Sequence, residues 1–125
     1  MPGLLGRGYC GGHVTLIFTI EDSDLDPVNQ GSRGVGICLE DGVEIICRGR
    51  EGKGNLDVFF SDHIGDSGLY MESLSLLSDG VPEVMEYDWE ANVKLGLPTG
   101  QGFGMSAAGS VSFCNSIQRA IGIPY

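Results

Sequence analysis

Glycine content is the feature that most constrains the fold of this chain. Glycine makes up 21 of the 125 residues, which is more than twice its ordinary share. The glycines follow no three-residue period, so a collagen helix is excluded, and they cluster where turns are expected. Because 42% of the residues are apolar, the chain can bury a core, and its length fits one domain. We therefore expect a globular domain in which many residues need unusual backbone angles.

The first half of the chain reads mainly as strands. His13–Ile20 and Leu56–Phe60 are rich in the β-branched and aromatic residues that strands favour. The Asp41–Gly42 pair separates two β-rich runs within Val35–Arg48, which predicts a hairpin turn, because both turn residues need positive φ. Apolar residues within Gly68–Leu77 have a helical spacing. The prediction is thus a strand, a hairpin, a further strand and a helix, in that order.

The last third of the chain predicts an extended segment, a glycine loop and a helix. Glu83–Leu97 reads as extended, and Ser106–Ile121 reads as a helix. Ser106 is the predicted N-cap, Arg119 suits the last helical turn, and Gly122 ends the helix. This element order indicates an α+β fold rather than alternating βαβ units.

The charge distribution argues against nucleic acid as a partner. The net charge is −10, and the segment 57–90 holds nine acidic residues and no lysine or arginine. Such a surface repels duplex DNA, and its simplest interpretation is a solvated, solubilising face.

Metal, export and membrane signals are missing from the sequence. The four cysteines show no CxxC spacing and only two histidines occur, so zinc is unsupported. There is no signal-peptide pattern and no apolar run of about 20 residues, the length that spans a bilayer. We expect a cytoplasmic protein with reduced thiols and no membrane partner, although the even number of cysteines leaves a disulfide open.

The segment PTGQGFGMSAAGS, residues 98–110, predicts an anion site, because it joins a glycine loop to a helix N-terminus whose amides are unpaired. A Walker A loop is excluded, since no lysine follows Lys94. Gly102, Gly104 and Ala107 satisfy the GxGxxA dinucleotide pattern, but no acidic residue follows Glu90 to bind a ribose. A purely structural turn remains open at this point.

Three segments, taken in order, resemble the GHMP kinase superfamily of galacto-, homoserine, mevalonate and phosphomevalonate kinases. PTGQGFGMSAA at 98–108 resembles its second motif, in which GLGSSAA follows a proline. GGHVT at 11–15 and DP…GSRGVG at 26–36 resemble segments of one branch, the archaeal pantoate kinases. Phe103 replaces the leucine of the motif, and Met105 replaces its first serine.

The resemblance implies a fold and an activity. The fold is the ribosomal-protein-like, two-layer α+β N-terminal domain of that superfamily, with a mixed sheet and a glycine loop before a helix. The implied activity is ATP- and Mg²⁺-dependent phosphorylation of a small alcohol, here pantoate to 4-phosphopantoate on the archaeal route to coenzyme A. Another acceptor of the homoserine or mevalonate type, or a non-catalytic association domain with the same fold, remains an alternative, and so does a homo-oligomer.

The resemblance also implies site residues. The ATP phosphates would be bound by the loop, whose residues are Gly100, Gln101, Gly102, Phe103, Gly104, Met105, Ser106 and Ala107. Ser106 would place its hydroxyl on Mg²⁺ or a phosphate. The acceptor would be bound by His13, Thr15, Ser32 and Arg33, with the Arg33 guanidinium on the pantoate carboxylate. A loop arginine paired with Asp24 or Asp26 is the competing interpretation of Arg33.

Residues 1–125 are interpreted as the ATP-binding N-terminal domain alone, truncated after the glycine-loop helix. By the resemblance, the catalytic aspartate, the Mg²⁺-binding acid and a second domain lie beyond Tyr125, so no catalytic residue is assigned. We therefore expect the 125-residue chain to be inactive by itself, and to expose apolar surface around Ile117, Ile121 and Ile123.

Overall fold

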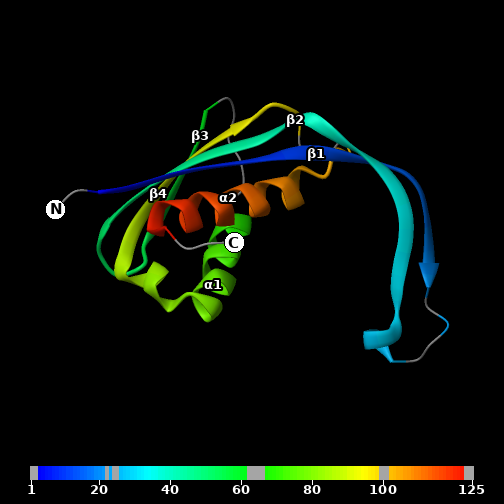
Figure 1. The fold of residues 1–125 in the computed structure, drawn as a ribbon, viewed down its shortest axis with the longest axis horizontal. Helices are drawn as coiled ribbons and strands as arrows, with labels where there is room; N and C mark the ends of the chain where they lie inside the picture. The colour runs from blue at the N-terminus through cyan, green and yellow to red at the C-terminus, as the bar shows by residue number, and fades with distance from the viewer. Residues whose placement is uncertain (1–2, 22, 24–25, 62–66, 99–101, 123–125) are drawn as a thin grey trace.

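The computed structural model describes residues 3–21, 23, 26–61, 67–98 and 102–122. They form a four-stranded sheet with two α-helices on one face, so that the fold has two layers (Figure 1). The elements are β1 (Leu4–Glu21), η1 (Pro27–Asn29), β2 (Gly31–Glu51), β3 (Leu56–Phe60), α1 (Gly68–Gly80), η2 (Pro82–Glu86), β4 (Tyr87–Leu95) and α2 (Met105–Ile121). The predicted α+β class is confirmed.

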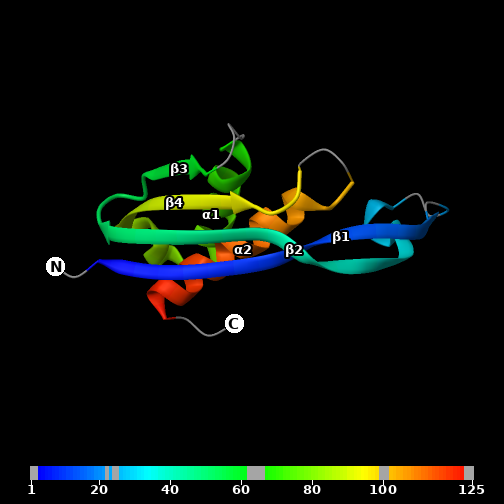
Figure 2. The ribbon, with the colours of Figure 1, turned by 90° about the horizontal axis from the view of Figure 1, so that it is seen from above.

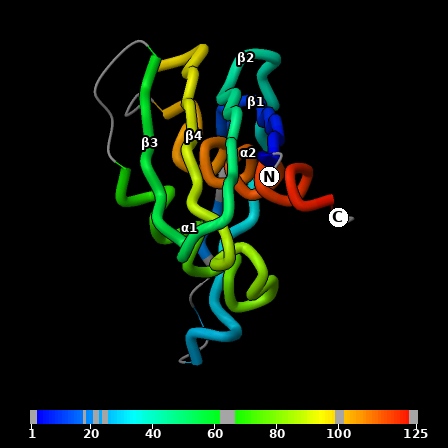
Figure 3. Tube along the Cα trace, turned by 90° about the vertical axis from the view of Figure 1, so that its left-hand side faces the viewer, coloured from blue at the N-terminus to red at the C-terminus, as the bar shows by residue number. Residues whose placement is uncertain are grey.

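The sheet is mixed, as predicted. Its strand order is β1-β2-β4-β3, visible for the last three strands in Figure 3. β1 pairs with β2, and β2 pairs with β4, both antiparallel, whereas β3 and β4 are parallel neighbours. Parallel neighbours need a crossover connection, and α1 lies in the connection between β3 and β4.

The core lies between the sheet and the two helices. Phe113 and Ile117 of α2 are fully buried in this core. Tyr70 of α1 packs edge-on against Phe113, with ring centroids 5.7 Å apart. The sheet contributes Val43, Ile45, Cys47, Leu56, Trp89, Ala91 and Val93. Alternate residues of β2 and β4 are buried because successive strand side chains point to opposite faces of the sheet.

Glycines in the first half of β1 let α2 lie directly on the sheet. A Cβ at Gly6 or Gly8 would overlap the α2 backbone at Ser116 or Ser112. The predicted strand began at His13, whereas β1 begins at Leu4. Leu4–Gly12 is not predicted as a strand because glycine has low strand propensity. In the structure, the glycines of this part of β1 leave room for α2.

The predicted hairpin at Asp41–Gly42 is wrong. Both residues lie inside the continuous strand β2, and neither has positive φ. The long partner β1 spans both halves of β2, pairing Gly11 with Gly42 and His13 with Cys38, so the chain has no reason to turn there. The extra β2 residues between these two pairs form a bulge instead.

The far halves of β1 and β2 form a two-stranded ribbon that extends beyond the helices (Figures 1 and 2). We call residues 13–21 and 31–38 the distal arm. Large apolar side chains on it are more than half exposed, namely Leu16, Ile17, Ile20, Val35 and Ile37. The apolar surface expected at Ile117 and Ile121 is not found, because Ile117 is fully buried in the core and Ile121 packs against it. Ile123 lies outside the described residues.

Most of the remaining secondary-structure predictions agree with the structure, although α1 extends to Gly80 rather than Leu77 and two other boundaries differ. The strand Leu56–Phe60 and the helix starting at Gly68 are confirmed, as are Arg119 in the last turn of α2 and Gly122 as its end. The predicted N-cap Ser106 is wrong: Gly104 caps α2, because its left-handed backbone starts the helix at Met105. Glu83–Leu97 is only partly extended, since Pro82–Glu86 forms a 3₁₀ turn before β4.

Candidate functional site

The glycine loop ends at the N-terminus of α2. Gly102 and Gly104 have φ of 79° and 63°, a left-handed backbone conformation that residues other than glycine rarely adopt. Helix N-terminal amides have no intrahelical partner and carry a partial positive charge, and the first turn of α2 holds no acidic residue that would neutralise it. A Cβ at Gly102 would meet nothing within 4 Å, so the backbone there is open to a ligand. The loop therefore fits phosphate.

The side chains of the loop have different surroundings. Met105 is buried in the core and Phe103 packs against it, whereas Ser106 and Ala107 are exposed. Gly100 and Gln101 lie outside the described residues. Among the described residues no group of His, Cys, Asp or Glu side chains could hold a metal ion. An exposed Ser106 hydroxyl at the helix start is compatible with Mg²⁺ that is bound mainly by phosphate oxygens.

The loop touches β1 at His13. The backbone N–H of His13 donates a hydrogen bond of 2.6 Å to the carbonyl oxygen of Phe103. A Cβ on Gly12 would lie 2.9 Å from that same oxygen, and a Cβ on Gly104 would lie 3.4 Å from His13 Cβ. These close approaches place the predicted phosphate loop directly beside the first predicted acceptor residue.

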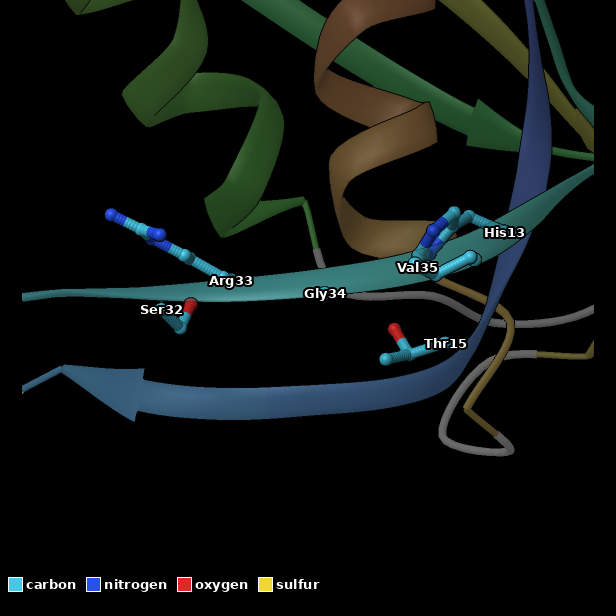
Figure 4. A pocket seen from close by; sticks show the side chains of 7 residues that line it. His13, Thr15, Ser32, Arg33, Gly34 and Val35 are labelled. Atoms are coloured by element: carbon cyan, nitrogen blue, oxygen red, sulfur yellow. The ribbon is translucent and has the colours of Figure 1, made fainter.

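The four predicted acceptor residues line one open pocket of about 470 Å³ on the distal arm. His13 and Thr15 come from β1, and Ser32 and Arg33 come from β2 (Figure 4). Ser32 and Arg33 leave β2 on opposite sides of the ribbon in Figure 4, as neighbours in a strand must. The structure thus places all four residues beside one pocket, with the Ser32 and Arg33 side chains on opposite sides of β2, and their roles stay a prediction.

Three further lining residues were not predicted: Gly34, Val35 and Gly36. Gly36 lies under the imidazole of His13, because a Cβ there would overlap Nε2 and lie 2.8 Å from Cε1. The repeated glycines of GSRGVG, residues 31–36, were a signal for such a contact.

The buried thiol of Cys47 does not belong to this site. It lies in the core, accepts a hydrogen bond from the Ser116 hydroxyl, and burial raises its pKa to about 12. A thiol with that pKa is protonated and unreactive near neutral pH. The four cysteines are free, and only Cys38, on the distal arm, is exposed.

Comparison with known proteins supports the sequence resemblance. No protein-family model matches the chain. A pantoate kinase from Methanospirillum hungatei JF-1 is 31% identical over 112 residues, which is 87% of this chain and 38% of that protein. The resemblance to the GHMP kinase superfamily is thereby confirmed, and it extends over an N-terminal portion of such a kinase.

Solved structures share the fold over nearly the whole chain. A "phosphotransferase related to CoA biosynthesis pathway" matches with a TM-score of 0.73 and 23% identity, over 97% of this chain and 41% of its own. Mevalonate kinase from methicillin-resistant Staphylococcus aureus MRSA252 matches with a TM-score of 0.60 and 16% identity, over 98% and 40%. "MDDEF in complex with MVAPP, AMPPCP and Magnesium" matches with a TM-score of 0.67 and 13% identity, over 97% and 38%.

The chain spans about two-fifths of the length of these relatives. Within the described residues, neither helix has the length and apolar character needed to cross a membrane.

Proposed function

We propose that this chain is the nucleotide- and acceptor-binding portion of an ATP- and Mg²⁺-dependent pantoate kinase. The observation that carries the proposal is the contact between the two predicted sites: the glycine loop before α2 hydrogen-bonds to His13, which lines the pocket of the four acceptor residues. The relationship to a pantoate kinase supports the choice of acceptor. A homoserine- or mevalonate-type acceptor is the second candidate, favoured by the fold shared with mevalonate kinase.

Phosphoryl transfer asks a protein mainly for positioning and charge neutralisation. The amides of the Gly102–Ala107 loop and the α2 N-terminus would bind the nucleotide phosphates, and the exposed Ser106 hydroxyl would contact Mg²⁺ or a phosphate. Bound Mg²⁺ would neutralise phosphate charge. Thr15 and Ser32 would orient the acceptor through their hydroxyls, and the Arg33 guanidinium would pair with its carboxylate.

Nucleotide binding is tested by calorimetric titration of AMPPCP–Mg²⁺ into the 125-residue chain. Gly104→Ala is the loop variant and Gly122→Ala is its matched control, because both glycines have left-handed backbone and cap opposite ends of α2. We expect saturable binding by the wild type and by Gly122→Ala, and at least about tenfold weaker binding by Gly104→Ala. Absence of binding by a folded wild type, or equal weakening in both variants, would contradict a phosphate-binding loop.

The acceptor is tested by titrating pantoate, homoserine and mevalonate in parallel. We expect pantoate to bind most tightly, and Arg33→Gln to weaken it by about tenfold or more, since a hydrogen bond to a charged group is worth about 1.5–3 kcal/mol. Arg50→Gln is the control, because Arg50 is an exposed arginine of the same strand outside this pocket. Preference for another acceptor would favour the second candidate.

We also propose that the 125-residue chain alone has no turnover, because the resemblance assigns the role of the catalytic aspartate to none of its residues. The expected result is nucleotide binding without ATP consumption in the presence of pantoate. ATP-dependent formation of 4-phosphopantoate by this chain would show that it holds the catalytic group. Failure of every ligand to bind a folded chain would favour the non-catalytic association domain.

A further inference from the structure

We propose that the Gly12–His13 segment of β1, which lies opposite the bulge in β2, couples the acceptor pocket to the glycine loop, so that a ligand in one site changes the affinity of the other. The inference rests on the proposed function, since it treats the pocket and the loop as two binding sites. The contacts that carry it do not depend on which acceptor binds.

A backbone donor beside the bulge bonds outside the sheet. Between the pairs Gly11–Gly42 and His13–Cys38, β1 advances by fewer residues than β2, and the register of the ladder shifts. The His13 N–H then bonds to the Phe103 carbonyl at 2.6 Å, in the glycine loop. Bulges interrupt a ladder and redirect the groups at the interruption. At this interruption the His13 N–H is the group that holds the loop.

The contact constrains the loop closely. A Cβ on Gly12 would lie 2.9 Å from the Phe103 oxygen and 3.0 Å from Leu97 Cδ1, so β1 and the loop cannot approach further. The peptide that joins Phe103 to Gly104 is trans and planar. Fixing its carbonyl on His13 therefore aims the Gly104 N–H away from β1. A shift of His13 would rotate this peptide and redirect a loop amide.

The side chain of the same residue belongs to the pocket. The His13 imidazole lines it and lies against Gly36 of β2 (Figure 4). Gly36 is a positioning residue, since any side chain there would displace the imidazole. A ligand that contacts the imidazole thus acts on a residue whose backbone holds the loop, and coupling between two sites is reciprocal.

The coupling is first tested without ligand, by amide NMR at Phe103 and Gly104. Gly36→Ala displaces the imidazole, and Gly31→Ala is the control, because a Cβ on Gly31 meets nothing within 4 Å. We expect Gly36→Ala to move both loop resonances and Gly31→Ala to leave them in place. A Cβ on Gly36 would also lie 2.7 Å from the Val14 carbonyl oxygen, so Gly36→Ala has a second route to the loop, through the β1 backbone. Gly36→Ala is therefore repeated in a His13→Ala background, where it should no longer move the loop resonances.

Two results of that experiment would overturn the proposal: loop resonances that Gly36→Ala does not move, or the same movement in the His13→Ala background. The second would show that the effect runs through the β1 backbone rather than through the imidazole.

Binding is tested next, by titrating AMPPCP–Mg²⁺ with and without saturating pantoate. We expect pantoate to tighten nucleotide binding about fivefold or more in the wild type and in Gly31→Ala. Gly36→Ala should reduce that factor to less than about twofold. A wild type that binds both ligands independently overturns the coupling. A folded wild type that binds neither ligand overturns the proposed function instead, and the loop resonances then decide whether the structural coupling exists.

Discussion

The two halves of the β1–β2 pair are made of the same strands yet have opposite surroundings. The proximal half pairs Leu4–Cys10 with Val43–Gly49 and lies under α2, where Val43, Ile45 and Cys47 are fully buried. The distal arm pairs 13–21 with 31–38 and extends beyond the helices (Figure 1). Its Ile17 is 72% exposed, whereas Ile45, the same residue type in the partner strand, is fully buried.

The difference shows that strand propensity does not decide burial. Both halves hold glycine, and the distal arm holds the larger share of the β-branched residues. In the proximal half, glycine admits a helix: Gly6 and Gly8 meet the α2 backbone. In the distal arm, Gly36 instead leaves space that the His13 imidazole occupies. An isolated two-stranded ribbon is marginally stable, so the proximal half holds the stability of the pair and the distal arm holds its candidate site.

The largest expected effect is on core packing. Ile45→Ala should lower the free energy of unfolding by about 2–5 kcal/mol, because it leaves a cavity in a closely packed core. Ile17→Ala removes the same atoms from the distal arm and should change stability by less than about 0.5 kcal/mol. Urea unfolding followed by circular dichroism measures both. Equal losses of unfolding free energy in the two variants would contradict the difference in burial between Ile45 and Ile17.

A smaller effect is expected where glycine meets α2. Gly8→Ala should cost about 1–3 kcal/mol, because its Cβ would overlap the helix backbone and force α2 outward. Gly31→Ala, in open space at the start of β2, is the matched control and should be close to neutral. The same unfolding experiment compares them. A neutral Gly8→Ala would mean that α2 does not pack on β1 as described.

Self-association should depend on the distal arm. Exposed apolar surface favours association, so the wild type should sediment faster as its concentration rises. The double change Ile17→Thr, Ile20→Thr keeps β-branched residues in the strand and should weaken this dependence, with no loss of folding. Sedimentation velocity at several concentrations measures it. A monomeric wild type would show that these side chains do not mediate contact between copies.

The smallest expected effect is a difference in chemical reactivity between two thiols of β2, those of Cys38 and Cys47. Burial raises the pKa of Cys47 to about 12, so its thiol stays protonated in the folded chain at pH 8, whereas Cys38 is exposed on the distal arm. We expect iodoacetamide to label Cys38 at pH 8 and to label Cys47 only after unfolding. Because the folded pKa lies above the unfolded value of about 8.5, the protonated thiol favours the folded state, and this contribution falls as pH rises towards 12. Peptide mass spectrometry identifies the labelled residue, and labelling of native Cys47 would contradict its burial.

Local signals predicted local structure well. The helix spacing of Gly68–Leu77, the end of α2 at Gly122 and the strand Leu56–Phe60 were readable, because helix periodicity, left-handed caps and strand propensity act within a few residues. The glycine loop and the resemblance to the superfamily could be predicted because three motifs occur in the expected order along the sequence. The assignment of roles to His13, Thr15, Ser32 and Arg33 remains a prediction, although one pocket gathers all four.

By itself, then, the sequence determined the fold class, the resemblance to the superfamily and the place of the glycine loop. Only the tertiary structure decided that Asp41–Gly42 stays extended, that β1 begins at Leu4, and that Gly36 supports the His13 side chain. Each of these depends on a partner that is distant in the sequence. β2 stays continuous because β1 pairs with both of its halves, the glycines of β1 leave room for α2, and Gly36 leaves room for His13. Such contacts depend on packing rather than on propensity, so strand propensity alone does not predict them.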